Sequence, residues 1–354
     1  MTHPPLPPGF SPRRILVLQQ RQIGDVLLAT PAVAAIRRRF PEAEIHFLTE
    51  SKCADMLVGN PDIDRIIPMD KRRLRGLAAF AWYWSTARQG YDLVIDFQSL
   101  PRLKWITLFS GAPIRFAATR KRRTSLIYNA FPDPICGGYA AWEKVDLLSA
   151  LGIENLHEPP KLILSDAELK AADAFLAGLG LKPGERLVTL DVTHRRPGCK
   201  WPAAYFAKAV GILHAAHPSL RFLAFWGPGE RDQAMEMFDD VPPEARSAVM
   251  RIPDVQPLRM IAACIARASL HLGNCSAPQH MAAALGTRAC IVVGATGPAW
   301  HCPTPGNTDV AAGLHCQFCH RHECPDGYPC LKGLMPDTVA KAAMDLLETP
   351  PRTS

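Results

Sequence analysis

The sequence lacks the features of a membrane-spanning or secreted protein. None of its apolar runs reaches the ~18–20 residues that a membrane-crossing helix needs. Residues 1–14 contain no apolar signal core, so we do not expect secretion. The chain is 48% hydrophobic and 21% charged, which excludes intrinsic disorder for most of it. At ~100–200 residues per domain, its 354 residues predict two domains.

Three common fingerprints of nucleotide binding and catalysis are also missing. No GxGxxG follows the first predicted strand, so the dinucleotide-binding fingerprint is absent. The chain has no GxxxxGK[ST] segment, which argues against a P-loop NTPase. It also has no GxSxG segment, the nucleophile turn of α/β-hydrolases.

Positive charge is present in modest excess and is unevenly distributed. Lys and Arg number 40 against 33 Asp and Glu, a net charge of +7. Residues 71–75 and 115–123 hold a large share of this excess. Such clusters favour an anionic partner, whether phosphate, nucleic acid or a lipid surface. The alternative interpretation is a solvated surface.

Strand-like and helix-like segments alternate twice along the chain. This alternation predicts parallel sheets built from βαβ units. Expected strands are 14–20, 44–50, 64–69, 91–97, 112–117, 186–192, 221–227 and 288–295. Expected helices are 72–88, 141–151, 166–178, 203–217, 230–238, 256–268 and 277–286, and a further one that ends at Arg39 and begins at either Asp25 or Thr30. Residues 153–185 are expected to connect two Rossmann-like halves around a central cleft.

Loops at the carboxyl ends of the predicted strands are expected to face this cleft, because open α/β sheets bind ligands there. The loops are 20–25, 193–200, 227–230 and 273–278. Several lead into helix N-termini, which attract phosphate through unpaired N–H groups and the helix dipole.

Four segments together resemble glycosyltransferase family 9, the ADP-heptose:lipopolysaccharide heptosyltransferases. They are ILVLQQRQIGDVLLATPAVAAIRRRFPEAEI, CKWPAAYF, FWGPGERDQA and LGNCSAPQHMAAALGTRACIVVGAT. The resemblance implies an α/β chain of GT-B fold, in which two Rossmann-like domains face a central cleft. It divides the chain into a disordered Pro-rich tail (1–12), an N-terminal acceptor-binding domain (13–165) and a C-terminal nucleotide-sugar-binding domain (166–354).

The resemblance also implies roles for individual residues. Asp25 matches the family's catalytic base, and general base catalysis of sugar transfer needs such a carboxylate. The alternative for Asp25 is a helix N-cap. Lys200 matches a lysine that contacts the donor's diphosphate, where a cation stabilises the leaving group. Glu230 matches a ribose-contacting glutamate. For both, a helix-terminal surface charge is the alternative.

Other donor-binding residues are expected in two loops. The segment that begins at Asn274 matches the family's Asn-Asp-Ser-Gly-Pro-x-His stretch, but carries Cys275 and Ala277 in place of Asp and Gly, with Ser276 and His280 retained. A thiol does not accept hydrogen bonds from sugar hydroxyls as a carboxylate does. Residues 191–199 lack the family's Asn-Pro-Gly start. The expected donor contacts in that loop are Thr193, His194 and Arg196.

The acceptor half carries the stronger positive charge. Gly24, Arg115, Arg120 and Arg122 are the expected acceptor-binding residues, since the lipopolysaccharide inner core carries carboxylates and phosphates. The aromatic residues Trp82, Tyr83, Trp84 and Trp105 either support contact with apolar or lipid material or belong to the core.

Four cysteines lie close together near the C-terminus. Cys316, Cys319, Cys324 and Cys330 fall within the segment 315–330 and have the number of thiols that a tetrahedral zinc site needs. Reduced thiols and disulfides are the alternatives. A Cys-rich tail is also seen in many members of the resembled family.

The sequence therefore predicts an inverting glycosyltransferase that moves a heptose or related sugar from ADP-heptose to the lipopolysaccharide inner core. Its partners would be a nucleotide-diphosphate sugar and a lipid A–core glycolipid, with peripheral contact at the cytoplasmic face of the inner membrane and no nucleic acid. No cofactor is obligatory in this prediction, and zinc would be structural. The alternatives are a non-catalytic or altered-specificity family member and a metal-dependent interaction protein built around the cysteines.

Overall fold

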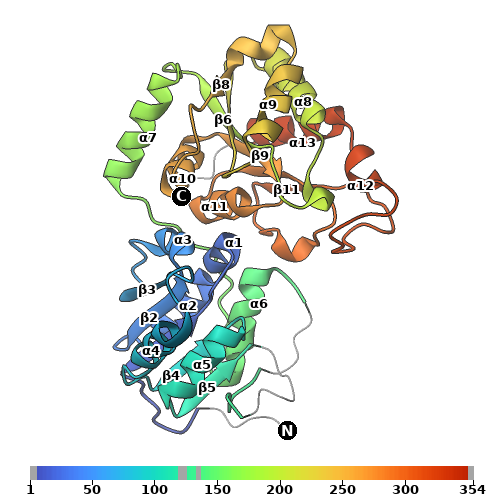
Figure 1. Ribbon diagram of the computed structural model, residues 1–354. Coiled ribbons are helices and arrows are strands. Elements are labelled where there is room, and N and C mark those ends of the chain that lie inside the picture. Colours follow the sequence, from blue (N-terminus) through green and yellow to red (C-terminus); the bar gives the residue numbers. More distant parts are fainter. Residues whose placement is uncertain (1–5, 119–125, 133–136, 350–354) are drawn as a thin grey trace. The chain divides into compact units, whose positions relative to one another are not determined.

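The computed structural model describes residues 6–118, 126–132 and 137–349. The chain forms two compact units, one that ends at Ile163 and one that begins at Leu164 (Figure 1). Each unit is built on a parallel sheet. In the described part of the chain, no helix combines the length and apolarity that crossing a membrane would require.

The first unit contains a parallel sheet of strand order β3-β2-β1-β4-β5. Its strands are β1 (Arg14–Leu18), β2 (Glu44–Glu50), β3 (Arg65–Met69), β4 (Leu93–Asp96) and β5 (Ile114–Ala117). Its helices are α1 (Ile23–Leu27), α2 (Thr30–Arg39), α3 (Ser51–Ala54), α4 (Gly76–Ala87), α5 (Pro101–Ser110) and α6 (Ala140–Leu147). The sequence left open where the helix that ends at Arg39 begins; the structure has two helices there, and Pro31 lies in the first turn of α2.

Alternating side chains of the first sheet build a core on each of its faces. In β1, Ile15 and Val17 pack with residues of α2 and α6. Leu16 and Leu18 point the other way and pack with residues of α4 and α5. Strands buried on both faces read as continuous apolar runs, as β1 does. Part of the segment predicted to be disordered also packs here, because Phe10 contacts Phe40 edge-on.

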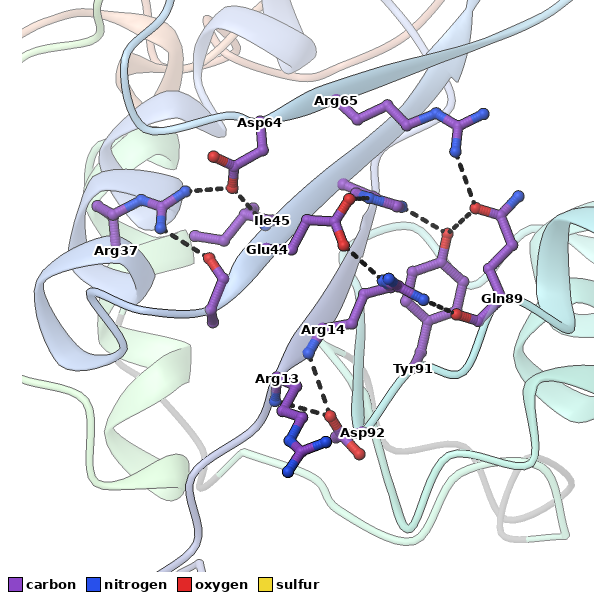
Figure 2. Close-up of polar contacts among 12 residues, drawn as sticks. Arg13, Arg14, Arg37, Glu44, Ile45, Asp64, Arg65, Gln89, Tyr91 and Asp92 are labelled. Carbon is purple, nitrogen blue, oxygen red and sulfur yellow. Dashed lines mark hydrogen bonds and ion pairs between the residues drawn. The ribbon is translucent and has the colours of Figure 1, made fainter.

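A polar network ties the strands of this sheet together at their amino ends (Figure 2). Glu44 accepts hydrogen bonds from Arg14 and pairs with His46, both at 2.7 Å. Asp92 accepts from the backbone N–H groups of Arg13 and Arg14. These contacts stabilise the strand register at the amino edge of the sheet. The loops that follow the strands lie at the opposite, carboxyl edge.

The second unit contains a parallel sheet of strand order β11-β10-β9-β6-β7-β8. Its strands are β6 (Arg186–Asp191), β7 (Leu220–Phe225), β8 (Val249–Arg251), β9 (Leu270–Asn274), β10 (Ala289–Val292) and β11 (Asn307–Val310). Its helices are α7 (Asp166–Gly178), α8 (Ala203–Ala216), α9 (Arg231–Asp240), α10 (Leu258–Arg267), α11 (Ala277–Leu285), α12 (Pro329–Lys332) and α13 (Pro336–Glu348).

The helices of the second unit pack in two groups. Helix α10 contacts α7 and α11, and α8 contacts α9 and α13 (Figure 1). Two double ion pairs join α7 to α10, between Glu168 and Arg259 and between Asp173 and Arg267. The buried Trp201 donates its indole N–H to the carbonyl of Leu334, which fastens the start of α8 to the segment before α13.

Candidate active site

Asp25 lies at the carboxyl edge of the first sheet. It is the third residue of the short helix α1, whose N-cap is Gln22, so Asp25 is not the N-cap itself. Its carboxylate accepts a hydrogen bond of 3.0 Å from the backbone N–H of Gln22 and is half-buried. Gly24, an expected acceptor contact, is buried in the same turn, and the Arg21–Gln22 peptide is cis. This arrangement fixes the carboxylate and leaves its second oxygen for other partners.

The turn after β4 supports the loop that carries Asp25. Asp96 accepts hydrogen bonds from the backbone N–H groups of Gln98 and Ser99 and, at 2.5 Å, from the Tyr128 hydroxyl. Burial raises the pKa of Asp96 to about 6, although these hydrogen bonds act to lower it. Gln98 in turn exchanges hydrogen bonds with the backbone of Arg21. The Asp25 loop therefore rests on a buried carboxyl group of the neighbouring strand.

A lysine that the sequence did not single out lies in the field of Asp25. Burial lowers the pKa of Lys144, on α6, while the negative charges of Asp25 and Glu143 act to raise it. The sequence offered no motif to find it, because a lysine within an amphipathic helix has the appearance of an ordinary surface residue. The charge of Asp25 therefore favours the protonated form of Lys144, which burial disfavours.

Of the three arginines expected to bind the acceptor, the structure describes only Arg115. Arg115, on β5, donates from Nε to the carbonyl of Ile127 and from Nη1 to that of Ala112, both at 2.6 Å. These bonds hold the chain after β5 and occupy much of the guanidinium group. Arg120 and Arg122 lie outside the described residues.

In the second unit, Glu230 gathers groups from two loops at the carboxyl edge of the sheet. It is the N-cap of α9, directly after the glycine-rich turn that follows β7. Its carboxylate accepts from the Thr193 hydroxyl at 2.7 Å, the Gly227 N–H at 3.1 Å and Arg195 at 3.2 Å. A Cβ on Gly227 would come within 2.9 Å of the Glu230 carboxylate, so a larger residue there would displace that carboxylate from its present position. Thr193 and Glu230, both predicted donor contacts, are thus brought together.

A second junction joins the loop after β9 to the loop after β6. The Asn274 side chain accepts a hydrogen bond from the backbone N–H of Trp201 at 2.9 Å and donates one to the backbone carbonyl of Asp191 at 3.2 Å. Ser276, the N-cap of α11, donates its hydroxyl to the Asp191 carboxyl group. Burial raises the pKa of Asp191 to about 7, and the nearby charge of Glu230 adds to the effect. Lys200 immediately precedes Trp201, so this junction also positions its backbone.

Asp191 and Asp96 are site residues that were not predicted from the sequence, although both share a sequence signal. Each is an acidic residue at the end of an otherwise apolar strand, in YDLVIDF and RLVTLDV. Such a residue lies at the ligand-binding edge of a parallel sheet. A Cβ on Gly273 would come within 2.6 Å of the Asp191 Cβ, so this glycine makes room for the buried carboxyl group.

The position at which the resembled family has an aspartate carries a neutral thiol. Burial raises the pKa of Cys275 to about 12, so its sulfur stays protonated near neutral pH. Ala277 begins α11, and the buried His280 lies on the same helix with its ring edge-on to Trp300, 6.3 Å away. The hydrogen bonds of this loop do reach one carboxyl group, that of Asp191 on the neighbouring strand β6, which accepts from Ser276.

Two basic residues of the 193–200 loop, His194 and Arg196, contact backbone groups. Burial lowers the pKa of His194, and its Nδ1 accepts from the Arg196 N–H at 2.9 Å. Arg196 donates to the carbonyls of His320 at 3.1 Å and Arg321 at 3.3 Å. The loop is thereby fastened to the Cys-rich segment, a connection that the sequence did not predict.

All four clustered cysteines line one cavity of about 290 Å³, which Gly198 and Ala295 also line. The Ala295 N–H donates to the Gly198 carbonyl at 2.7 Å, and the His320 N–H donates to the Ala295 carbonyl at 2.8 Å. Among the residues that the structure describes, no three His, Cys, Asp or Glu side chains are arranged to hold a metal ion. The structure thus gathers Cys316, Cys319, Cys324 and Cys330 around one space without forming a coordination site.

Comparison with known proteins assigns this architecture to a family. The model of glycosyltransferase family 9 (heptosyltransferase) matches residues 83–328, well over half of the chain, and the protein therefore belongs to that family. Among curated relatives, lipopolysaccharide heptosyltransferase 3 of Escherichia coli is 23% identical, with 77% of this chain and 81% of the relative covered.

Solved structures of the family share the fold. A family 9 glycosyltransferase from Veillonella parvula superposes with a TM-score of 0.81 at 21% identity, covering 95% of this chain and 97% of the other. E. coli heptosyltransferase WaaC with ADP-2-deoxy-2-fluoro heptose gives a TM-score of 0.70 at 20% identity, covering 94% and 99%. The two parallel-sheet units are thus the two domains of a GT-B glycosyltransferase, as the sequence predicted.

Proposed function

We propose that this enzyme transfers a heptose from ADP-heptose to a sugar hydroxyl of the lipopolysaccharide inner core, with inversion at the anomeric carbon. The observation that carries the proposal is the cluster at the carboxyl edge of the second sheet. There Thr193 donates to Glu230 at 2.7 Å, and Asn274 and Ser276 donate to the backbone carbonyl and the carboxyl group of Asp191, so residues of three different loops are held at this edge. Family membership and the heptosyltransferase names of the relatives support the choice of sugar.

In the proposed reaction, each domain supplies one half of the chemistry. Asp25 takes the proton of the acceptor hydroxyl while the hydroxyl oxygen forms a bond to the anomeric carbon of the donor sugar. The bond from that carbon to the diphosphate oxygen breaks, and ADP leaves with the electron pair. General base catalysis of this kind contributes ~10²–10⁴-fold. Lys200 and the N–H groups at the starts of the second unit's helices would stabilise the departing diphosphate, so the proposal requires no metal in the chemical step.

A nucleotide-sugar panel tests the donor. ADP-heptose at ~100 times its dissociation constant is expected to stabilise the protein by ~2.7 kcal/mol in a thermal-shift assay, and GDP- and UDP-sugars are expected to do less. Lys200→Ala is expected to reduce the binding free energy of ADP by ~1.5–3 kcal/mol. Lys208→Ala, an exposed lysine of α8, is the matched control. Equal binding by the parent and Lys200→Ala would make Lys200 a surface charge only.

Cys275 supports a second candidate, a family member with altered specificity or without catalytic activity. A neutral thiol stands where the resembled family has a carboxylate, and it does not accept hydrogen bonds from sugar hydroxyls as a carboxylate does. Turnover separates the two. A protein that binds nucleotide sugars but transfers none of them to any lipid A–core acceptor would favour the second candidate.

The cysteine-lined cavity supports a structural metal, with Cys316, Cys319, Cys324 and Cys330 as the ligands. Thiolates select zinc and iron, and coordination would draw the four sulfurs closer together. Because Arg196 bonds to backbone of the same segment, the metal would also stabilise the 193–200 loop. Elemental analysis of protein purified without added metal is expected to find one equivalent of zinc. Trace amounts of zinc would contradict the site.

The acceptor defines where the enzyme works. A lipid A–core glycolipid is anchored in the inner membrane, so the proposal includes peripheral contact of the first domain with the cytoplasmic face of that membrane. Arg115, with Arg120 and Arg122, is proposed to lie near the anionic groups of the acceptor. The proposal includes no nucleic-acid partner.

A further inference from the structure

Helices α4 and α5 of the first domain expose an unusual group of aromatic and aliphatic side chains. The exposed fractions are 88% for Leu77, 53% for Phe80 and 48% for Trp84 on α4, and 51% for Trp105 and 43% for Leu108 on α5. The two helices pack against each other on one face of the sheet (Figure 1). Contiguous exposed apolar surface of this kind marks an interaction site.

The rings form one continuous cluster around a partly buried phenylalanine. Phe109 contacts Phe80, Trp84 and Trp105, with ring centroids 5.2–5.5 Å apart. Phe80 also stacks on Trp84, at 6.5 Å. Each ring is held by another, so the apolar surface is a fixed part of the fold rather than a set of separate side chains. We call these five exposed residues and Phe109 the aromatic patch.

The helices that carry the aromatic patch, and the segments beside them in the sequence, contain only positive charges; two of these cations, Lys71 and Arg73, pair with Glu50 and Asp70, which lie outside those segments. Residues 71–91 and 97–118 contain no Asp or Glu. They contain the cations Lys71, Arg72, Arg73, Arg75, Arg88, Arg102, Lys104 and Arg115. Arg88 lies over the Trp84 ring at 5.5 Å. Two copies of such a surface would repel each other, whereas anionic lipid headgroups would be attracted to it.

We infer that the aromatic patch, with its surrounding arginines, docks the enzyme on an anionic lipid bilayer. Tryptophan rings prefer the membrane interface, where an apolar body and a polar N–H are both accommodated. Leu77 and Phe80 lie in the first turns of α4, which begins at the carboxyl edge of the sheet, the edge that also carries Asp25. Trp84, Leu108 and Phe109 lie in the last turns of α4 and α5, so the aromatic patch extends along both helices. The inference rests on the proposed membrane contact and names its surface.

Co-sedimentation of the full chain with lipid vesicles tests this inference. The parent is expected to bind vesicles that contain phosphatidylglycerol and to bind pure phosphatidylcholine much more weakly. Trp84→Gln/Trp105→Gln and Arg75→Glu/Arg102→Glu are each expected to weaken binding at least ~10-fold. The matched controls are Val58→Gln/Leu156→Gln, exposed apolar residues of the same unit, and Arg13→Glu/Arg39→Glu, exposed arginines of the same unit; both should bind like the parent.

Each result has one meaning. If the parent fails to bind anionic vesicles, the proposed membrane contact itself is wrong. If the parent binds and both patch variants bind equally well, membrane contact stands but the aromatic patch is not its surface. If the parent is a dimer by sedimentation and Trp84→Gln/Trp105→Gln is a monomer, a second copy of the chain occupies the patch and the inference is overturned. Thermal melting of every variant confirms that losses do not come from unfolding.

Discussion

At the scale of single residues, the two domains place a carboxyl group in comparable positions for different purposes. Asp25 follows β1 on a short helix and keeps one oxygen in a hydrogen bond to the Gln22 N–H. Asp191 ends β6 and is buried beneath the Ser276 hydroxyl. The half-buried carboxyl group has the access that a catalytic base needs, and the buried one is suited to organise the loops around it.

Replacing Asp25 by Asn is expected to lower the rate of transfer ~10²-fold or more, because the amide cannot accept the acceptor's proton. Its oxygen still accepts from the Gln22 N–H, so stability should change by less than ~1 kcal/mol. Steady-state transfer and thermal melting are the measurements, with Glu42→Gln, an exposed residue of the same unit, as control. Full activity of folded Asp25→Asn would remove Asp25 from the mechanism.

Asp191 gives a prediction about pH. Burial raises the pKa of its carboxyl group from 3.8 to about 7. Between these values the unfolded chain releases a proton that the folded chain keeps, so this group makes stability fall as pH rises. Asp191→Asn, which still accepts from Ser276, is expected to be more stable than the parent above pH 7, by on the order of 1–4 kcal/mol, and to lose this advantage near pH 4.

Chemical denaturation at the two pH values measures this difference. Asp239→Asn, at an exposed position of α9, controls for the loss of one charge. An Asp191→Asn variant whose advantage is the same at both pH values would show that the carboxyl group is ionised in the folded protein throughout.

Two contacts of the candidate site join distant segments of the chain, and the sequence predicted neither of them. The bonds of Asp191 with Ser276 and of Arg196 with the Cys-rich segment join residues more than 80 positions apart. No local pattern encodes such a contact, so the sequence predicted Arg196 as a donor contact without its backbone partners. The short motifs at helix starts are different, because Glu230 and Ser276 are recognisable from their own segments.

At the scale of helices and strands, long apolar segments were the predictable ones. Each of the eight predicted strands corresponds to a strand of the structure, because buried parallel strands read as apolar runs. The edge strands β8 and β11 were missed, since the first has only three residues and the second reads NTDV, a polar run without a strand signal. The central strand β9 was also missed, because its apolar residues follow those of helix α10 almost without a break.

The contact between α7 and α10 gives a prediction at this scale. Arg259 donates twice to Glu168, at 2.5 and 2.6 Å, and these bonds lower the pKa of Glu168 to about 2. The ion pair therefore stabilises the fold above pH 4.5, and the effect is lost as pH falls toward 2. Glu168→Gln keeps the capping interaction with Ser165 but loses the charge.

Glu168→Gln is expected to reduce the free energy of unfolding by about 1–2 kcal/mol near pH 7 and by about half as much near pH 3, measured by urea denaturation at both. Asp173→Asn removes the other, more exposed pair of the same two helices and should cost no more than ~1 kcal/mol. Equal losses at the two pH values for Glu168→Gln would show that packing, and not charge, accounts for its effect.

At the scale of the whole molecule, the sequence predicted the α/β class and the GT-B fold, because strand and helix alternation and four motifs extend over most of the chain. It did not predict which aromatics are surface and which are core. Tyr83 is buried, while its neighbour Trp84 and the distant Trp105 are exposed around Phe109. That distinction follows from how α4 packs on α5, and the apolar character shared by all these side chains does not reveal it.

The central claim is that this chain transfers a heptose from ADP-heptose to a lipid A–core acceptor. The most direct measurement is mass spectrometry of the acceptor after incubation with the purified enzyme and ADP-heptose, alongside release of ADP. The account predicts an acceptor heavier by one heptosyl unit, ADP formed in equal amount, and neither product with Asp25→Asn over the same time. Binding of ADP-heptose without any change in the acceptor's mass, across lipid A–core acceptors, would contradict it.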